Sequence, residues 1–264
     1  MAEEPNKLAL VTGASSGIGF ELAKRFADDG YDLVIAAEDD GITTAAGKLS
    51  NDGTHVRPVK VDLRSAEGVR ELYERATEGR HALDAAAINA GVGTSGRFVD
   101  SDLGHDLSVI DLNVRSTTHL TKLVLRDMVK RGSGKVLLTS SVASMMPGSY
   151  QNVYNATKSY VQSLAEAVHD ELHDTGVTVT ALMPGPTGTN FFHRAGLDQT
   201  PVGKAPKDDP ARVAEEGYRA MQRGDQKVMA GSLMSKAMGT VNRVLPDRVK
   251  ALGSRVISIP LNRG

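Results

Sequence analysis

Short apolar runs alternate with longer amphipathic stretches along most of the chain. The runs are rich in Val, Leu, Ile and Ala, and those that we predict as strands are Leu8–Thr12, Asp32–Ala37, His55–Val61, Asp84–Asn89, Lys135–Ser140, Val177–Met183 and Lys227–Ala230. Strands that are apolar throughout are typical of a parallel sheet covered on both faces. The amphipathic stretches predict helices over Gly17–Asp29, Ile42–Asn51, Ala66–Glu78, Leu107–Lys130, Tyr154–Asp174 and Ala211–Arg223. The alternation predicts an α/β fold with one doubly wound domain over residues 1–264.

Two segments interrupt this alternation. The stretch from Asn190 to Pro210 contains three prolines and no clear periodicity. A loop of this length in a compact domain is often a lid or a binding loop, so we expect residues 190–210 to cover a site. The end of the chain, Leu233 to Gly264, contains two more prolines and is expected to be a partly helical C-terminal extension.

Composition excludes several classes of protein. The formal net charge is −1, from 31 Lys and Arg against 32 Asp and Glu, which provides no general attraction for nucleic acid. The longest purely apolar run, Leu33–Ala37, is far shorter than the roughly 20 residues of a membrane-spanning helix. The segment Met1–Lys7 lacks the apolar core of a secretory signal. The absence of cysteine excludes disulfides and thiol catalysis and favours a cytoplasmic location.

A glycine-rich turn follows the first predicted strand. In Thr12–Gly19, Gly13 would allow a tight turn, Gly17 would let the backbone approach a diphosphate, and Gly19 would allow close packing of helix and strand. The start of the following helix would offer free N–H groups and a positive dipole end to phosphates. The spacing G-x-x-x-G-x-G differs from the common G-x-G-x-x-G pattern, and a simple strand–helix turn remains an alternative.

A second cluster of polar residues lies later in the chain. Tyr154 and Lys158 stand four residues apart near the start of a predicted helix, and Ser141 precedes Tyr154 by thirteen residues at the end of a strand. Residues four apart share one helix face, so the phenol and the ammonium can act together. An ammonium would lower the phenol pKa from its usual value of about 10. Taken alone, such a pair is more often a solvated surface feature, and Tyr160 on the same helix is a weaker rival because it faces another side.

The motifs together resemble one known family. The motifs are Thr12–Gly19, Asn89–Gly91, Asn113, Ser141, Tyr154 with Lys158, and Pro184–Gly185. Their order and spacing, over roughly residues 7–231, are similar to those of the short-chain dehydrogenase/reductase family. The resemblance implies a Rossmann-type fold with a seven-stranded, mostly parallel sheet, helices on both faces and a bound NAD or NADP. It also implies an oxidoreductase that interconverts a secondary alcohol and a ketone by hydride transfer.

The resemblance assigns a catalytic set. Tyr154 would be the general acid in reduction and the base in oxidation, and Ser141 would hydrogen-bond the substrate oxygen. Lys158 would bind the nicotinamide ribose and lower the pKa of Tyr154. Asn113 would help to hold a water that links Lys158 to solvent. The alternatives are a 3-oxoacyl-carrier-protein reductase, for which no residue selects an acyl carrier, and a non-catalytic cofactor-binding regulatory protein.

The resemblance also implies a cofactor-binding set. Asp62 would accept a hydrogen bond from the adenine amino group, Thr187 would lie near the carboxamide, and Thr189 near the phosphates. The full set is Gly13, Ser15, Ser16, Gly17, Ile18, Gly19, Glu38, Asp39, Asp62, Leu63, Asn89, Ala90, Gly91, Tyr154, Lys158, Pro184, Gly185, Thr187 and Thr189.

The end of the second strand bears on the choice of cofactor. A 2′-phosphate needs a basic partner, whereas a free ribose diol suits a carboxylate. Ser16 and Glu38 stand where NADP-binding members carry basic residues, and Asp39 and Asp40 follow Glu38. Ala37, however, stands where NAD-binding members carry Asp. We therefore expect NAD(H) to be favoured over NADP(H), with Glu38 or Asp39 as the ribose ligand.

No metal site is expected. His169 and His173 have a spacing that suits zinc, but Asp170 replaces the Glu of the zincin motif and both histidines are expected on the solvent side of their helix. The expected partner is a small-molecule alcohol or ketone. Members of the family pair through the two long helices, here Leu107–Lys130 and Tyr154–Asp174, so a homodimer or homotetramer is expected. Candidate interface residues are Val161, Leu164, Ala165 and Val168, although at least half of them are expected to belong instead to the core of their own chain.

Overall fold

The computed structural model describes residues 6–51, 53–80, 82–232 and 246–259. Its centre is a seven-stranded sheet with the order β3-β2-β1-β4-β5-β6-β7, and every strand pairs with its neighbours in parallel. The strands are β1 (Leu8–Thr12), β2 (Asp32–Ala37), β3 (Val56–Lys60), β4 (Leu83–Ile88), β5 (Gly134–Thr139), β6 (Val177–Pro184) and β7 (Lys227–Ala230). The fold class and all seven predicted strands are confirmed, and the described sheet is parallel throughout.

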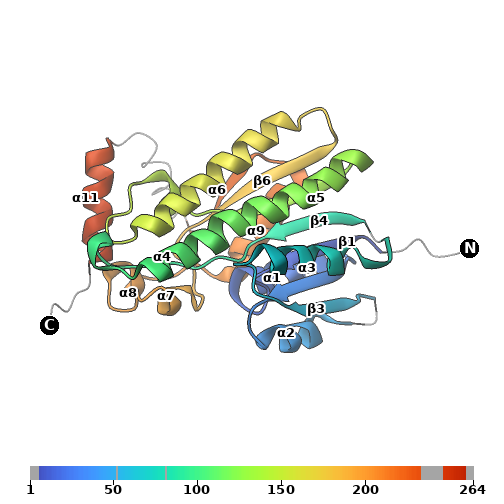
Figure 1. Cartoon of the computed structure of the whole chain (residues 1–264), viewed down its shortest axis with the longest axis horizontal. Helices are drawn as coiled ribbons and strands as arrows, with labels where there is room; N and C mark the ends of the chain where they lie inside the picture. Colours follow the sequence, from blue (N-terminus) through green and yellow to red (C-terminus); the bar gives the residue numbers. More distant parts are fainter. Residues whose placement is uncertain (1–5, 52, 81, 233–245, 260–264) are drawn as a thin grey trace, which may run out of the picture.

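Helices cover both faces of the sheet (Figure 1). One face packs against α3 (Ala66–Ala76), α5 (Thr117–Arg131) and α6 (Asn152–Glu171), and the other against α1 (Gly17–Asp28), α2 (Gly41–Leu49) and α9 (Pro210–Arg223). The other helices in the described part of the chain are α4 (Leu103–Ile110), α7 (Phe191–Arg194), α8 (Pro201–Lys204) and α11 (Asp247–Ser258), with short 3-10 turns η1 (Glu78–Arg80), η2 (Phe98–Asp100) and η4 (Val142–Met145). Burial of apolar side chains in the two layers is the main source of stability.

One predicted helix is longer and less regular than the sequence pattern indicated. The expected helix Leu107–Lys130 begins at Leu103, because the Asp102 side chain accepts a hydrogen bond from the backbone N–H of His105 at 2.7 Å and caps its start. The helix then passes through a π-helical segment, η3 (Asp111–Ser116), before α5 continues it. Such segments are rare and often occur at functional sites.

The sheet order reverses next to its first strand. The chain leaves β1 for β2 and β3 on one side, and then returns to place β4 on the other side of β1. At such a switch point the loops after neighbouring strands turn in opposite directions and leave a crevice at the carboxyl ends of the strands. This topology places the glycine turn after β1 beside the loops that follow β4 and β5.

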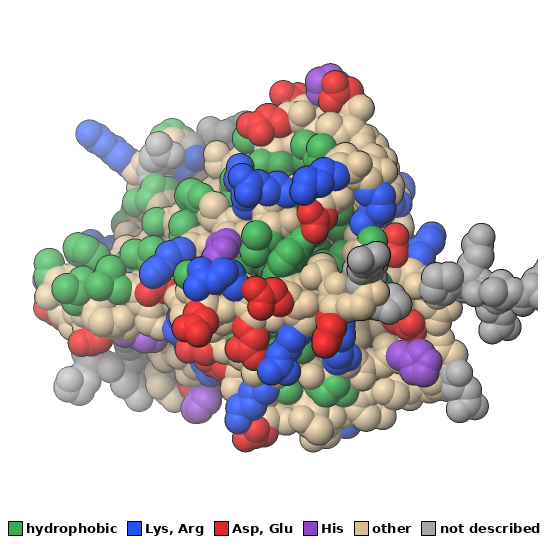
Figure 2. All heavy atoms as spheres, turned by 45° about the vertical axis from the view of Figure 1, so that its right-hand side comes forward, with side chains coloured by type: hydrophobic (Ala, Val, Ile, Leu, Met, Phe, Trp, Pro, Cys, Tyr) green, Lys and Arg blue, Asp and Glu red, His purple; other side chains and the backbone are tan. Residues whose placement is uncertain are grey.

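Acidic and basic side chains are interspersed on the face drawn in Figure 2, in keeping with the nearly balanced composition. Among the described helices, none is both long and apolar enough to cross a membrane.

Candidate active site

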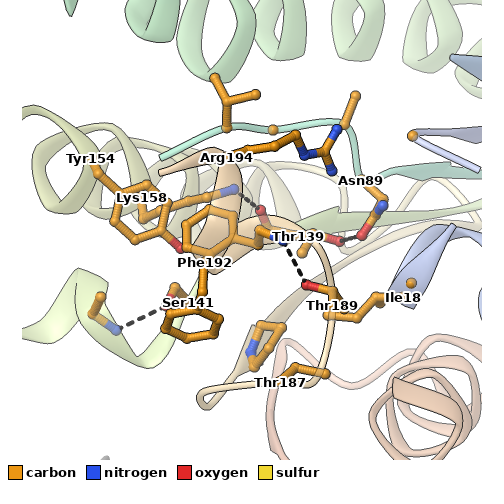
Figure 3. A pocket seen from close by; sticks show the side chains of 18 of the residues that line it. Ile18, Asn89, Thr139, Ser141, Tyr154, Lys158, Thr187, Thr189, Phe192 and Arg194 are labelled. Atoms are coloured by element: carbon orange, nitrogen blue, oxygen red, sulfur yellow. Dashed lines mark hydrogen bonds between the residues drawn. The ribbon is translucent and has the colours of Figure 1, made fainter. Parts of the chain in front are cut away.

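A large cavity opens at the carboxyl ends of the central strands (Figure 3). Of the predicted cofactor-binding set, every residue except Gly19 lines this cavity, and so do Ser141, Tyr154 and Lys158. Gly13 and Thr189, which are 176 positions apart in the sequence, therefore both line this cavity. Asn113 and Gly19 lie behind the cavity wall.

The glycine turn forms a close-fitting cradle. Gly17 has φ +60°, and a Cβ atom added there would lie 2.8 Å from Cγ2 of Thr189. A Cβ atom on Gly19 would lie 2.1 Å from the carbonyl oxygen of Gly13, so Gly19 allows the packing of α1 against the turn. The Ser16 side chain makes no capping hydrogen bond, which leaves the first N–H groups of α1 available at the cavity. This arrangement fits a diphosphate group.

Tyr154 and Ser141 lie together in the cavity. Both side chains are nearly buried, at 8% exposure each. Burial raises the pKa of Tyr154 to about 12, while a hydrogen bond with Ser141 acts in the opposite direction. Ser141 Oγ also accepts a hydrogen bond from the backbone N–H of Ala143 at 3.1 Å, which fixes its position at the end of β5. The phenol is thus held in its protonated, proton-donating form at neutral pH.

Lys158 lies beside this pair. Its Nζ donates a hydrogen bond to the carbonyl oxygen of Thr139 at 2.9 Å and lies 6.0 Å from the centroid of the Tyr154 ring. Burial lowers the pKa of Lys158 to about 8. In the protein without a cofactor, burial dominates the pKa of Tyr154, so its lowering by Lys158 together with a cationic nicotinamide stays a prediction.

Asn113 lies behind the cavity wall and stabilises it through hydrogen bonds. Its Nδ2 donates to the carbonyl oxygen of Val92 at 2.8 Å and to Thr157 Oγ1 at 3.0 Å, and its Oδ1 accepts from the backbone N–H of Val92 at 3.0 Å. A Cβ atom on Gly91 would lie 3.1 Å from both Asn113 Oδ1 and Lys158 Nζ. The π-helical segment therefore carries a side chain that ties the loop after β4 to the helix of Tyr154.

The opposite end of the cavity contains three carboxylates. The Arg64 guanidinium forms an ion pair with Glu38, another with Asp62 at 3.0 Å, and a hydrogen bond to Ser108 Oγ at 2.9 Å. Asp39 accepts hydrogen bonds from Ser15 Oγ at 2.8 Å and from the backbone N–H of Gly41 at 2.9 Å. Arg64 was not predicted as a site residue, because nothing in the local sequence pattern shows that it folds back onto the end of β2.

The individual residues of the other cavity wall were also not predicted from the sequence. It comes from the segments after β5 and β6 and from α11, and its members are Val142, Ala143, Met146, Gln151, Asn155, Phe191, Phe192, Arg194, Val202, Ser254 and Ile257. The predicted lid segment 190–210 signalled part of it. No periodicity in the sequence signalled the part from α11.

One minor expectation is wrong. His169 does not face solvent, since it is half-buried and its Nδ1 lies 2.8 Å from the carbonyl oxygen of Val179 in β6. This hydrogen bond gives His169 a structural role, and among the described residues no group of three or more His, Asp or Glu side chains is placed to hold a metal ion.

Comparisons with known proteins agree with this geometry. A family model described as short chain dehydrogenase matches residues 7–200. The oxidoreductase UcpA of Salmonella typhimurium is 32% identical over 225 residues, which are 84% of this chain and 82% of that protein. A short-chain dehydrogenase from Sphingobium yanoikuyae, solved in complex with NADPH, is 29% identical with a TM-score of 0.78, and the match covers 84% of this chain and 87% of that one.

A third similar protein is the 3-ketoacyl-(acyl-carrier-protein) reductase from Brucella melitensis, solved in complex with NADH. It is 26% identical with a TM-score of 0.74, and the match covers 84% of this chain and 95% of that one. With the family model spanning most of the sequence and the motif residues gathered around one cavity, the chain belongs to the short-chain dehydrogenase/reductase family of NAD(P)-dependent oxidoreductases, which act on CH–OH groups.

Proposed function

We propose that this protein interconverts a secondary alcohol and a ketone with NAD(P) as the hydride carrier. The observation that carries the proposal is the convergence of Ser141, Tyr154 and Lys158 in the cavity that the glycine turn also lines. A bound nicotinamide cofactor supplies or accepts the hydride. We further propose that residues 1–264 act as one domain, with residues 190–210 as a lid over the substrate.

The side chains then have distinct roles. Tyr154, protonated at neutral pH, donates its proton to the carbonyl oxygen in reduction and takes it back in oxidation. Ser141 donates a hydrogen bond to the same oxygen, where negative charge develops. Lys158 binds the nicotinamide ribose and supplies positive charge near the phenol. Asn113 positions the loop after β4 and, through its π-helical segment, supports a water path to Lys158.

The cofactor-binding roles follow the same placement. We propose that the turn Gly13–Gly19 holds the diphosphate, that Asp62, Leu63 and Asn89–Gly91 hold the adenosine half, and that Pro184–Thr189 holds the nicotinamide half. In support of this, all three groups line one cavity, apart from Ala14 and Gly19 in the turn and Gly188 in the last group.

The test is consumption of NADH or NADPH with a panel of neutral ketones and a β-ketoacyl thioester on an acyl carrier protein. Turnover of the ketones supports the proposal. Turnover of the thioester alone would favour the alternative activity of an acyl-carrier-protein reductase, the activity for which the similar Brucella melitensis protein is named. Binding of cofactor without turnover of any substrate would favour the non-catalytic alternative.

We predict that NADH binds about tenfold more tightly than NADPH, which corresponds to roughly 1.4 kcal/mol. Asp39 lies beside the glycine turn, and Glu38 and Asp62 already neutralise Arg64, so a 2′-phosphate would meet net negative charge. The double variant Glu38→Ser with Asp39→Arg should reverse the preference. Titration of the fluorescence of the two reduced cofactors measures both affinities.

Asp40→Ser is the matched control for this prediction. Its carboxylate pairs with Lys60 at 2.5 Å and does not line the cavity, so the preference should stay unchanged. Equal affinity of the native protein for the two cofactors would contradict the assignment of Asp39 and Glu38.

We also propose a homodimer, although not through the residues first expected. Val161 and Ala165 are buried in the core of the same chain, and Leu164 and Val168 pack against that core. The described exposed large apolar side chains on these helices are instead Val129 on α5 and a group on α4 and α6 that comprises Leu103, Leu107, Ile110 and Tyr160. A two-fold axis through the group on α4 and α6 would bring the same patch together from both copies.

Light scattering at micromolar concentration is expected to show a dimer or a larger assembly. Leu107→Asp should shift the protein to monomer, because it places a charge in an apolar interface. Val249→Asp on α11 is the control, since Val249 is 49% exposed and Leu107 is 50% exposed. A native protein that is monomeric under these conditions would rule out the interface.

A further inference from the structure

The part of the cavity around Tyr154 is bounded by aromatic rings from the lid segment. The ring of Phe191 lies 5.1 Å from that of Tyr154, and the ring of Phe192 lies 5.5 Å from that of Phe191. Lys207 fixes this pair, because its Nζ lies 4.3 Å from the centroid of Phe192. The same ammonium donates hydrogen bonds of 2.7 to 2.8 Å to the carbonyl oxygens of residues 202, 203 and 205, which ties the rings to α8.

The C-terminal helix α11 adds a further wall. Gln151, three residues before Tyr154, donates a hydrogen bond from Nε2 to Ser258 Oγ at 2.7 Å. One face of α11 is buried, with Ser254 at 3% and Ser258 at 1% exposure, and Ser254 and Ile257 line the cavity. The opposite face is exposed, with Leu252 at 61%. In Figure 1, α7, α8 and α11 lie at one end of the molecule, while α2 and β3 lie toward the other.

The carboxylates that line the cavity lie away from this end, and Lys158 is the charged group beside Tyr154 among the described lining residues. The lining carboxylates, Glu38, Asp39 and Asp62, stand at the ends of β2 and β3. Lys158 is held by the carbonyl oxygen of Thr139. In the view of Figure 3, Arg194 extends toward the side of Asn89 and away from Ser141. Apart from Lys158, the described wall beside Ser141 and Tyr154 is therefore mainly apolar, with amide and hydroxyl groups as its other polar part.

We propose that this end of the cavity binds the hydrocarbon chain of an uncharged ketone or secondary alcohol, and that Ile257 of α11 determines specificity for chain length. The inference rests on the proposed function. Met146, Phe191, Phe192, Val202 and Ile257 supply the apolar surface. The family model matches residues 7–200, so α11 lies outside the matched part of the chain.

The first test is a series of unbranched 2-alkanones of increasing length. Burial of each further methylene is expected to raise kcat/KM by about fourfold until the cavity is filled. Ile257→Ala should lower kcat/KM by about tenfold for long ketones and leave 2-butanone nearly unchanged. Leu252→Ala, on the exposed face of the same helix, is the matched control and should match the native protein with every ketone.

A second readout needs no cofactor and no turnover. Added 2-alkanols should raise the Tm of the cofactor-free protein more strongly as the chain lengthens. Ile257→Ala should lose most of this increase and Leu252→Ala should keep it. Ile257→Phe should exclude long alcohols and still accept short ones, which guards against general misfolding of the alanine variant.

The outcomes separate this inference from the proposed function. If no ketone oxidises NADH or NADPH, the proposed function fails, and the Tm series still decides whether the apolar end binds hydrocarbon chains. If ketones are reduced without dependence on chain length, the inference fails and the function stands. Equal kcat/KM and Tm values for Ile257→Ala and Leu252→Ala would show that α11 is not part of the binding surface. A preference for 2-keto acids would instead indicate that a cation such as Arg194 contacts the substrate.

Discussion

The Tyr154→Phe variant is expected to bind cofactor normally and to lose turnover by about 10²-fold or more, the scale of a positioned general acid. The substitution removes only the phenol oxygen. The ring keeps its packing against Phe191, and the buried site at 8% exposure keeps its shape. Reduction of a ketone at neutral pH, compared with cofactor affinity from fluorescence titration, measures the two effects separately.

Tyr160→Phe is the matched control, because Tyr160 lies on the same helix, is 40% exposed and bonds Thr118 Oγ1 at 2.9 Å. It should retain native turnover. In the oxidation direction the native rate should rise with pH, because Tyr154 must first lose a proton and burial raises its pKa to about 12. Near-native turnover of Tyr154→Phe would end the assignment of Tyr154 as the acid.

The Lys158→Met variant is expected to lose both cofactor affinity and rate, with kcat/KM lower by about 10²-fold. Methionine fills similar space but offers no donor to a ribose hydroxyl and no positive charge near the phenol. This double loss distinguishes Lys158 from Tyr154, whose removal should change the rate alone. Steady-state kinetics and fluorescence titration of the same preparation give both quantities.

Lys158 also predicts a dependence of stability on pH. Burial lowers its pKa from 10.5 to about 8, so between these values the unfolded chain binds more protons than the folded protein. The free energy of unfolding contributed by Lys158 therefore rises as pH increases from 8 to 10.5. Urea denaturation should show this rise in the native protein and not in Lys158→Met, and an identical slope in both would contradict the burial of a charged Lys158.

The sequence by itself determined the elements whose signals are local. The strand bounds Leu8–Thr12, Asp32–Ala37 and Lys227–Ala230 match the structure, because a short apolar run between turn residues specifies a buried strand. The glycine turn was equally predictable, from the spacing of Gly13, Gly17 and Gly19 directly after the first strand. The sequence pattern placed Ser141 at the carboxyl end of β5, and the spacing of Tyr154 and Lys158 placed both on one face of α6.

Tertiary structure decided the rest, because those features depend on contacts between distant segments. The pairing of Arg64 with Glu38 spans 26 residues and neutralises the basic group nearest to the expected ribose site. The contact of Gln151 with Ser258 spans 107 residues and brings α11 to the cavity. The burial that raises the pKa of Tyr154 in the protein alone is another such feature, because a pattern of residues shows which groups are close but not how far they are removed from water.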